Sequence, residues 1–442
     1  MKRLPGIISL CVAVFAIVVI AYWPTFVKHS EVAARVASLP TMAPVTPDYT
    51  RRDQTIAFWE KMVAKHMNGD MLSPRQLSGQ YLQRYREHGD IADVSRAEKA
   101  AKQSLRAMPR HNVPAELELA SIYLTLHRFH DALRVTHFIE NHDIADEAMS
   151  VREASLDMEV GEYARARTLL DRVDVAKRDD SWRVVESRYL ELTGKLGQAR
   201  DLLATASAYQ NANFDAPAQS RAWYFFRQGE MAFEAGDNDA AVADEKQSIA
   251  VFPNFADAYR AEARFECALH RWHECLTSAQ ASANIVPYPE TLGYEVDAEH
   301  ALGNDTAAKA TADTIVAIEK IGNAQHISDR LLAIYYSEHH IRTADAYRIA
   351  KRELAVRDDI LTEDTLAWAA AMDGRWDEAR AADRKAMRFQ SENSLLHYHA
   401  GVIAEHFGER EQAKRYFTQA LALNPEFHQV YADDARAQLA KL

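Results

Sequence analysis

The chain has 442 residues, and its 15 glycines and 13 prolines are few for that length, which favours helices. Its formal net charge of -12 and the lack of any compact run of Lys and Arg argue against a nucleic-acid partner, because phosphate binding needs a basic surface. Of the three cysteines, Cys11 lies in an apolar leader, and Cys267 and Cys275 are too few for a disulfide framework.

The first 23 residues carry Lys2 and Arg3 ahead of an uncharged apolar run that ends at Trp23. This run has about the length of a short transmembrane helix, and its basic flank favours a cytoplasmic N-terminus. We therefore predict a signal anchor over residues 1–23, a single pass through the cytoplasmic membrane and a body on the periplasmic side. The alternative is a signal that is cleaved before Tyr22, which would release the chain into the periplasm.

Two further segments precede the main body of the chain. Residues 24–52 hold several prolines among small residues and show no long apolar periodicity, which indicates a linker. In residues 53–76, apolar side chains recur at Ile56, Trp59 and Val63, at the spacing of one helix face. This second segment predicts a lone amphipathic helix that packs at the start of the body.

The stretch 394–425 predicts two amphipathic helices that are joined at Gly408, with Pro425 ending the second helix. Gly401 on the first helix and Ala413 on the second would let the two helices approach closely, because neither carries a large side chain. The same turn and small residues recur about 34 residues earlier. The chain is therefore built from repeats.

Small residues near the start of each expected second helix can be aligned over residues 77–425. They are Ala97, Ala132, Ala166, Ala199, Ala241, Cys275, Ala308, Ala346, Ala379 and Ala413. Most steps between them are close to one repeat of about 34 residues, so the register predicts about ten helical hairpins. The polar insertion 207–221 falls in the longest step and is expected to form a loop. His127 occupies a turn position that most other repeats give to glycine.

This pattern of small residues, glycine turns and closing prolines resembles the tetratricopeptide repeat (TPR) family over residues 77–425. The resemblance implies an all-α fold, a right-handed superhelical solenoid of about ten helix-turn-helix repeats. A solenoid needs a polar cap, and residues 426–442 predict a C-terminal capping helix. The closing segment also looks like the ends of exported bacterial proteins of this class.

In proteins of this family the first helix of each repeat lines a concave face, so the resemblance implies a peptide groove in the central repeats. Its candidate residues are Arg188, Trp223, Phe226, Glu230, Phe233, Arg260 and Arg264. Aromatic anchors flanked by arginines suit a peptide groove. The alternative is that Trp223 and Phe226 pack beneath the loop 207–221.

No pattern in the sequence predicts catalysis or metal binding. His127, His130, His137 and His142 lie close together, but no carboxylate or cysteine completes a recognisable set of ligands. The sequence also lacks a glycine-rich phosphate loop, a G-x-S-x-G elbow and an HExxH motif. We therefore expect no enzyme, no cofactor and no metal site.

Cys267 and Cys275 fall on the two helices of one repeat. We interpret them as small buried thiols, since cysteine packs well in small apolar positions. The alternative is a disulfide, which an oxidising compartment would permit.

The function expected from these features is that of a non-catalytic protein-binding scaffold. It would display its groove at the membrane to a protein or peptide partner, in the assembly or maturation of envelope proteins. The alternatives are a metal- or cofactor-handling accessory protein and an envelope enzyme.

Overall fold

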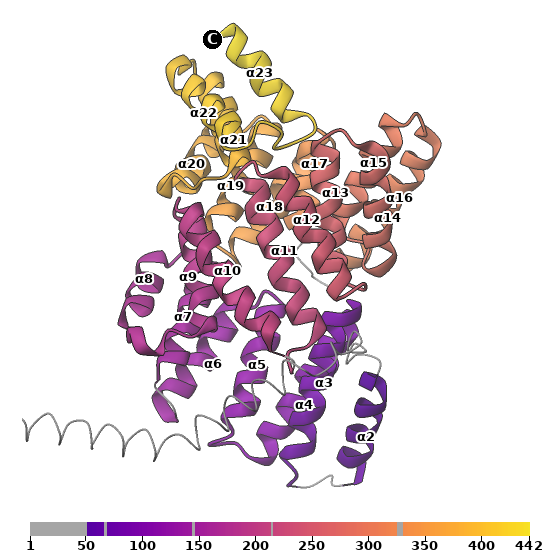
Figure 1. Ribbon diagram of the computed structural model, residues 1–442, viewed down its shortest axis with the longest axis vertical. Helices are drawn as coiled ribbons and strands as arrows, with labels where there is room; N and C mark the ends of the chain where they lie inside the picture. The colour runs from indigo at the N-terminus through magenta and orange to yellow at the C-terminus, as the bar shows by residue number, and fades with distance from the viewer. Residues whose placement is uncertain (1–50, 66–68, 144–145, 214, 325–329) are drawn as a thin grey trace, which may run out of the picture. The chain divides into compact units, whose positions relative to one another are not determined.

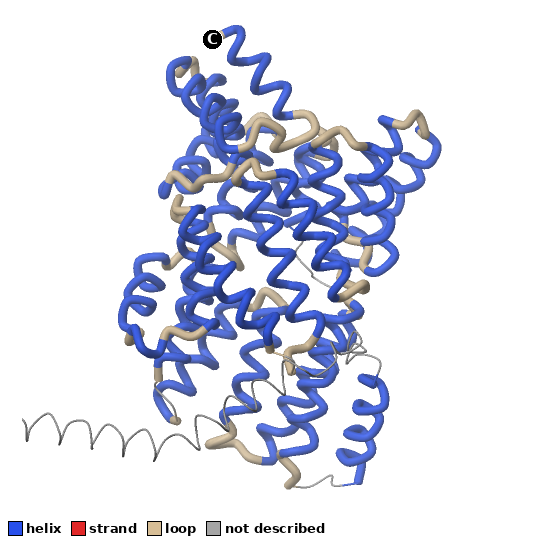
Figure 2. The backbone as a smooth tube through the Cα atoms, in the orientation of Figure 1, coloured by secondary structure: helices blue, strands red, loops and turns tan. Residues whose placement is uncertain are grey.

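The computed structural model describes residues 51–65, 69–143, 146–213, 215–324 and 330–442. They belong to one compact unit, Tyr49–Leu442, and every regular element among them is a helix (Figures 1 and 2). The predicted anchor over 1–23 and the linker up to residue 50 lie outside the described residues. None of the helices in the described ranges is long and apolar enough to cross a membrane.

Ten helical hairpins follow one another along the described chain (Figure 1). Their first helices are α3 (Leu72–His88), α5 (Val113–Thr125), α7 (Glu147–Glu159), α9 (Asp180–Leu192), α11 (Ala218–Glu234), α13 (Ala256–Ala268), α15 (Pro289–Ala301), α17 (Arg330–Glu338), α19 (Ile360–Met372) and α21 (Ser394–His406). Their second helices are α4 (Ile91–Ala107), α6 (Phe129–His142), α8 (Tyr163–Arg172), α10 (Leu196–Ala212), α12 (Asn238–Val251), α14 (Trp272–Ile285), α16 (Asp305–Ala324), α18 (Thr343–Leu354), α20 (Trp376–Ala386) and α22 (Arg410–Leu423).

Single helices lie at the two ends of this series, and short helical turns occur within it. The helix α2 (Arg52–Lys65) precedes the first hairpin, and α23 (Tyr431–Lys441) follows the last. Two 3₁₀ turns, η2 (Val175–Lys177) and η3 (Met387–Phe389), follow α8 and α20.

The aligned small residues are the points where the two helices of each hairpin cross. All ten, from Ala97 to Ala413, have an exposed fraction of 0%. In the last hairpin, a Cβ atom on Gly401 would lie 2.7 Å from the ring of Phe417, so only glycine fits against that ring. The crossing positions inferred from the sequence therefore match the packing of the helices.

Besides Arg342, which precedes α18 and has a φ of 46°, each of the ten turns between paired helices has one residue with a positive φ, between 52° and 80°. Seven of these residues are glycine, which adopts this left-handed conformation without a steric penalty. The other three are His127, His270 and His340. Histidine is among the non-glycine residues that are enriched in this conformation, which explains why the glycine pattern has gaps.

The structure differs from the loop expected over 207–221. The helix α10 continues to Ala212 and α11 begins at Ala218, so only residues 213–217 connect them. Ala206 and Ala222 near these ends are fully buried. The insertion lengthens two packed helices, because its alanine and glutamine residues are good helix formers.

Cys267 and Cys275 are joined by a disulfide, which links α13 to α14 within one hairpin. Both residues have an exposed fraction of 0%. The interpretation as two free buried thiols was therefore wrong in chemistry, although right in burial.

Candidate binding chamber

The stack of hairpins curves back on itself, so that residues far apart in the sequence touch. The amide of Asp358 donates to the carbonyl oxygen of Glu159, at 3.1 Å. The amide of Ile360 donates to the hydroxyl of Tyr163, also at 3.1 Å. The turn of the third hairpin thus meets the connection that enters the ninth.

The same kind of contact recurs one hairpin further on. Ser391 donates its hydroxyl proton to the carbonyl oxygen of Glu191, at 3.2 Å, and the amide of Leu196 donates to Glu392, at 2.7 Å. Asn424 then donates its side-chain amide to the carbonyl oxygen of Phe233, at 2.7 Å. We call this row of contacts, from Glu159 with Asp358 to Phe233 with Asn424, the seam.

A chamber of about 980 Å³ lies on the inner side of this curve. First helices of successive hairpins supply much of its wall, including α9, α11, α13, α15, α17 and α19. Many of the side chains in this wall are charged. They include Arg188, Glu191, Arg227, Glu230, Glu234, Asp257, Arg260, Arg264, Glu290, Arg330, Glu353, Arg357 and Asp364.

On one side of the chamber, a single carboxylate holds two arginines. Glu191 pairs with Arg188 at 2.9 Å and with Arg227 at 2.8 Å. Burial by itself would raise the pKa of Glu191, but the charges of Arg227 and Arg188 outweigh that effect and lower the pKa to about 2. Glu191 therefore stays ionised and fixes both guanidinium groups.

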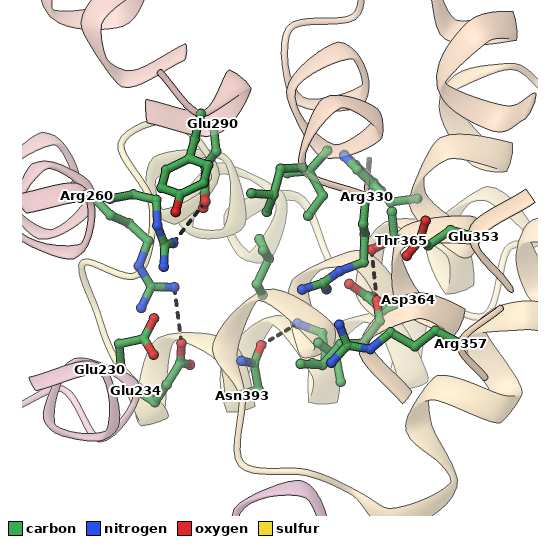
Figure 3. A pocket seen from close by; sticks show the side chains of 18 of the residues that line it. Glu230, Glu234, Arg260, Glu290, Arg330, Glu353, Arg357, Asp364, Thr365 and Asn393 are labelled. Atoms are coloured by element: carbon green, nitrogen blue, oxygen red, sulfur yellow. Dashed lines mark hydrogen bonds and ion pairs between the residues drawn. The ribbon is translucent and has the colours of Figure 1, made fainter. Parts of the chain in front are cut away.

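The neighbouring helices continue this ladder of charges (Figure 3). Arg260 pairs with Glu290 at 2.9 Å, and Arg264 approaches Glu234 at 3.5 Å. Burial raises the pKa of Glu234 to about 7, because the longer contact with Arg264 offsets the loss of hydration only in part. This carboxyl group therefore titrates near neutral pH.

The opposite wall carries two guanidinium groups, Arg357 and Arg330, and the second pairs with none of the described residues. Arg357 pairs with Asp359 at 2.8 Å and also contacts Glu159. Arg330 has no hydrogen bond or ion pair to any residue in the described ranges, and its side chain is directed into the chamber (Figure 3). Burial and then the charge of Arg357 lower the pKa of Arg330. An anionic group placed here would gain a strong partner.

The residues predicted for a peptide groove fall into two groups. Arg188, Glu230, Arg260 and Arg264 line the chamber together. The aromatic residues Trp223, Phe226 and Phe233 are not among its lining.

These three aromatic residues pack between helices. Phe226 has an exposed fraction of 6% and lies edge-on to Phe255, with ring centroids 5.7 Å apart. Phe233 has an exposed fraction of 2% and stacks on Phe265. Trp223 is half-buried between two apolar clusters. Their role as ligand anchors stays a prediction; in this structure the three side chains pack against neighbouring helices.

Sequence reasoning missed Glu191, Arg227, Arg330 and Arg357. A signal for two of them was present, because Glu191 follows Arg188 by one helical turn and Arg227 precedes Glu230 in the same way. Arg330 and Arg357 carry no such signal, since they reach the chamber only through the curvature of the stack.

A cluster of His137, Glu140 and Glu153 places possible metal ligands within 4.8 Å of one another. Arg165 already contacts Glu153 and lies 2.9 Å from Nε2 of His137. The guanidinium supplies the positive charge that a metal ion would bring, so the geometry favours an ion-pair network at this place.

Comparisons with known proteins add little to this description. No family model and no curated protein matches the chain. The Cut9-Hcn1 structure from the APC/C hetero-tetramer covers 89% of this chain and 93% of its own, with 12% identity and a TM-score of 0.33. A tetratricopeptide repeat protein from Parabacteroides merdae ATCC 43184 covers 59% and 97%, with 17% identity and a TM-score of 0.33. MamA AMB-1 covers 39% and 92%, with 15% identity and a TM-score of 0.31.

These likenesses are too distant to bear on function, so the fold rests on the chain's own geometry. Ten consecutive hairpins cross at fully buried small residues, and each turns at a residue with positive φ. The described chain therefore folds as a stack of TPR-like helical hairpins.

Proposed function

We propose that this chain is a non-catalytic scaffold whose chamber holds a segment of a partner protein. The observation that carries the proposal is Arg330, a guanidinium in the chamber that pairs with no described residue. The other chamber arginines discussed above each have a carboxylate partner, such as Glu191 for Arg188 and Glu290 for Arg260. A carboxylate from a partner segment would complete the set.

The composition of the wall fits a polypeptide ligand. Fixed guanidinium and carboxylate groups offer donors and acceptors to a main chain, and half-buried residues such as Leu361 and Ile334 offer apolar contact. The groups are held by their ion pairs before a ligand arrives, which lowers the entropic cost of binding.

We further propose that residues 1–23 hold the chain in the cytoplasmic membrane, with the body on the periplasmic side, where it assists the assembly or maturation of envelope proteins. The apolar run behind Lys2 and Arg3 supports the anchor. The disulfide between Cys267 and Cys275 fits an oxidising compartment.

The experiment is site-specific photo-crosslinking of the full, membrane-held chain in cells. One crosslinker replaces Ile334, which lines the chamber, and a second replaces Val175, which is 73% exposed on the surface. We expect a discrete protein adduct from position 334 and none of the same mass from position 175.

A pair of matched variants makes the test specific. Arg330→Gln removes the unpaired guanidinium, whereas Arg348→Gln removes a guanidinium that pairs with Asp345 on the surface. The adduct from position 334 should fall strongly in Arg330→Gln and persist in Arg348→Gln. Equal yields in both variants, or no adduct from the chamber, would rule out the proposed role of the chamber.

A further inference from the structure

A second groove, of about 750 Å³, lies within the first two hairpins, away from the residues of the seam. The helices α4, α5 and α6 and the connections between them form its walls. Its lining residues are Lys102, Leu105, Arg106, Pro109, Glu116, Leu119, Tyr123, Arg128, Asp131, Arg134, Val135 and Phe138. Except for Arg128, none of them lines the chamber.

The floor of this groove is apolar and partly open to water. Leu119 and Tyr123 are almost buried, with exposed fractions of 7% and 8%. Phe138 at the edge has an exposed fraction of 40%. Covering such an aromatic ring releases water from a large apolar surface and is favourable.

The rim of the groove is cationic. Glu98 forms ion pairs with Lys102, at 2.6 Å, and with Arg128, at 3.1 Å. Asp131 forms ion pairs with Arg128 and Arg134. Two carboxylates therefore balance three cations.

A fourth cation on the rim, Arg106, is exposed and has no ion pair within the part of the chain that the structure describes. The rim thus carries an excess of positive charge on a chain whose formal net charge is -12. This contrast selects an acidic partner over a basic one.

One polar group is buried in the groove itself. Glu116 has an exposed fraction of 4%, and its Oε2 atom has no hydrogen-bond partner among the described residues. Burial, and then the charge of Asp143, raise the pKa of this carboxyl group. In its protonated form it offers a hydrogen-bond donor to an acceptor on a bound partner.

We propose that this groove docks an amphipathic helix of a partner protein, with the apolar face of the helix on Leu119, Tyr123 and Phe138 and its acidic flank against Arg106 and the neighbouring cations. The concave shape favours a helix over a bilayer surface, because a flat surface would not reach the floor between α4 and α6. The site shares only Arg128 with the chamber, and neither Arg106 nor Phe138 lines the chamber, so the two proposals can be tested separately.

The test is a selection from displayed helical peptides of about five turns, all with leucine at positions i, i+3, i+4 and i+7. One half of the library has glutamate at the flanking positions, and the other half has lysine there. The full chain, held in bilayers of neutral lipid, is the bait. We expect enrichment of the glutamate-flanked helices alone, and the selected peptides then serve as probes in fluorescence anisotropy.

Two groove variants and two control variants test whether binding occurs in the groove. Arg106→Glu and Phe138→Ser change exposed residues of the groove, whereas Arg415→Glu makes the same charge change on α22, at an exposed position of the last hairpin. We expect each groove variant to weaken binding by about tenfold or more, and Arg415→Glu and Arg330→Gln to leave it unchanged.

Several results would overturn the proposal. The proposal fails if lysine-flanked helices are enriched, if neither half of the library is enriched, or if both groove variants still bind the selected peptides.

It also fails if the chain binds no peptide but binds vesicles of phosphatidylcholine with phosphatidylglycerol, and if Arg106→Glu abolishes this vesicle binding. That outcome would assign the cationic rim to a membrane surface.

Discussion

A Cβ atom on Gly161 would lie 2.5 Å from the backbone carbonyl oxygen of Asp358. The same relationship holds for Gly194 with the carbonyl oxygen of Gln390, at 2.7 Å. These turn glycines thus meet two requirements, a positive φ within their own hairpin and a close approach of a distant backbone. Gly374 meets only the first, since no heavy atom outside its own neighbourhood lies within 4 Å of its Cβ position.

The seam predicts unequal costs for two similar substitutions. Substituting alanine for Gly161 or Gly374 should lower the free energy of unfolding by roughly 1 to 2 kcal/mol, because alanine disfavours the left-handed backbone conformation. Gly161→Ala should lose a further ~1 to 3 kcal/mol, because the carbonyl group of Asp358 must move. Chemical denaturation of both variants measures the difference, and equal losses would mean that the seam does not form.

The hairpin register predicts the effect of overpacking a crossing. Ala413 is fully buried between α21 and α22, so Ala413→Leu should cost roughly 1 to 3 kcal/mol. Ala422 lies on the same helix and is exposed, so Ala422→Leu should change the free energy of unfolding by less than about 0.5 kcal/mol. If both variants melted like the wild type, the assigned crossing would be incorrect.

Much of the fold could be predicted because its determinants are local. A small residue at a crossing and a left-handed residue at a turn each act within one hairpin, so Ala413 and Gly408 can be recognised from their own repeat. The three histidine turns were harder to see, since only His127 stood out from the sequence.

The closure of the stack and the contents of the chamber could not be predicted in the same way. Small rotations between neighbouring repeats add up, and their sum decides that Asp358 meets Glu159 and that Arg330 faces the chamber. The aromatic residues Phe226 and Phe233 were assigned to the groove because they lie on a first helix. In the structure, their side chains lie on the side of α11 that packs against α13 of the next hairpin.

The pKa of Glu234 predicts how stability changes with pH. This pKa rises from its ordinary 4.5 to about 7, so the folded chain keeps a proton that the unfolded chain has lost between these values. The stabilisation is full below pH 4.5 and is lost as the pH rises through 7. Wild type should therefore lose up to roughly 3 kcal/mol more than Glu234→Gln between pH 5 and 8. Parallel stability curves for the two proteins would contradict this pKa.

The disulfide predicts a response to reducing agents. Cys267 and Cys275 are eight positions apart, and closing so short a loop stabilises the fold by about 2 kcal/mol in the chain-entropy description. A reducing agent should lower the melting temperature of wild type to that of the Cys267→Ala, Cys275→Ala double variant, and leave the variant unchanged. If the melting temperature of wild type were the same with and without the reducing agent, even when the agent is added to the denatured chain, the bond would be absent in solution.

Closure of the stack is the central structural claim, since the chamber exists only if the seam holds. Ile360 is the first residue of α19, and Asp358 lies just before it, so neither amide has a partner within that helix. Their partners are Tyr163 and Glu159 across the seam.

Hydrogen exchange of these two amides, measured by mass spectrometry at single-residue resolution, therefore reports on the seam alone. Our account predicts slow exchange for Asp358 and Ile360 in wild type and in Gly374→Ala, and fast exchange in Gly161→Ala. Fast exchange of both amides in wild type would show that the stack stays open and that no closed chamber forms.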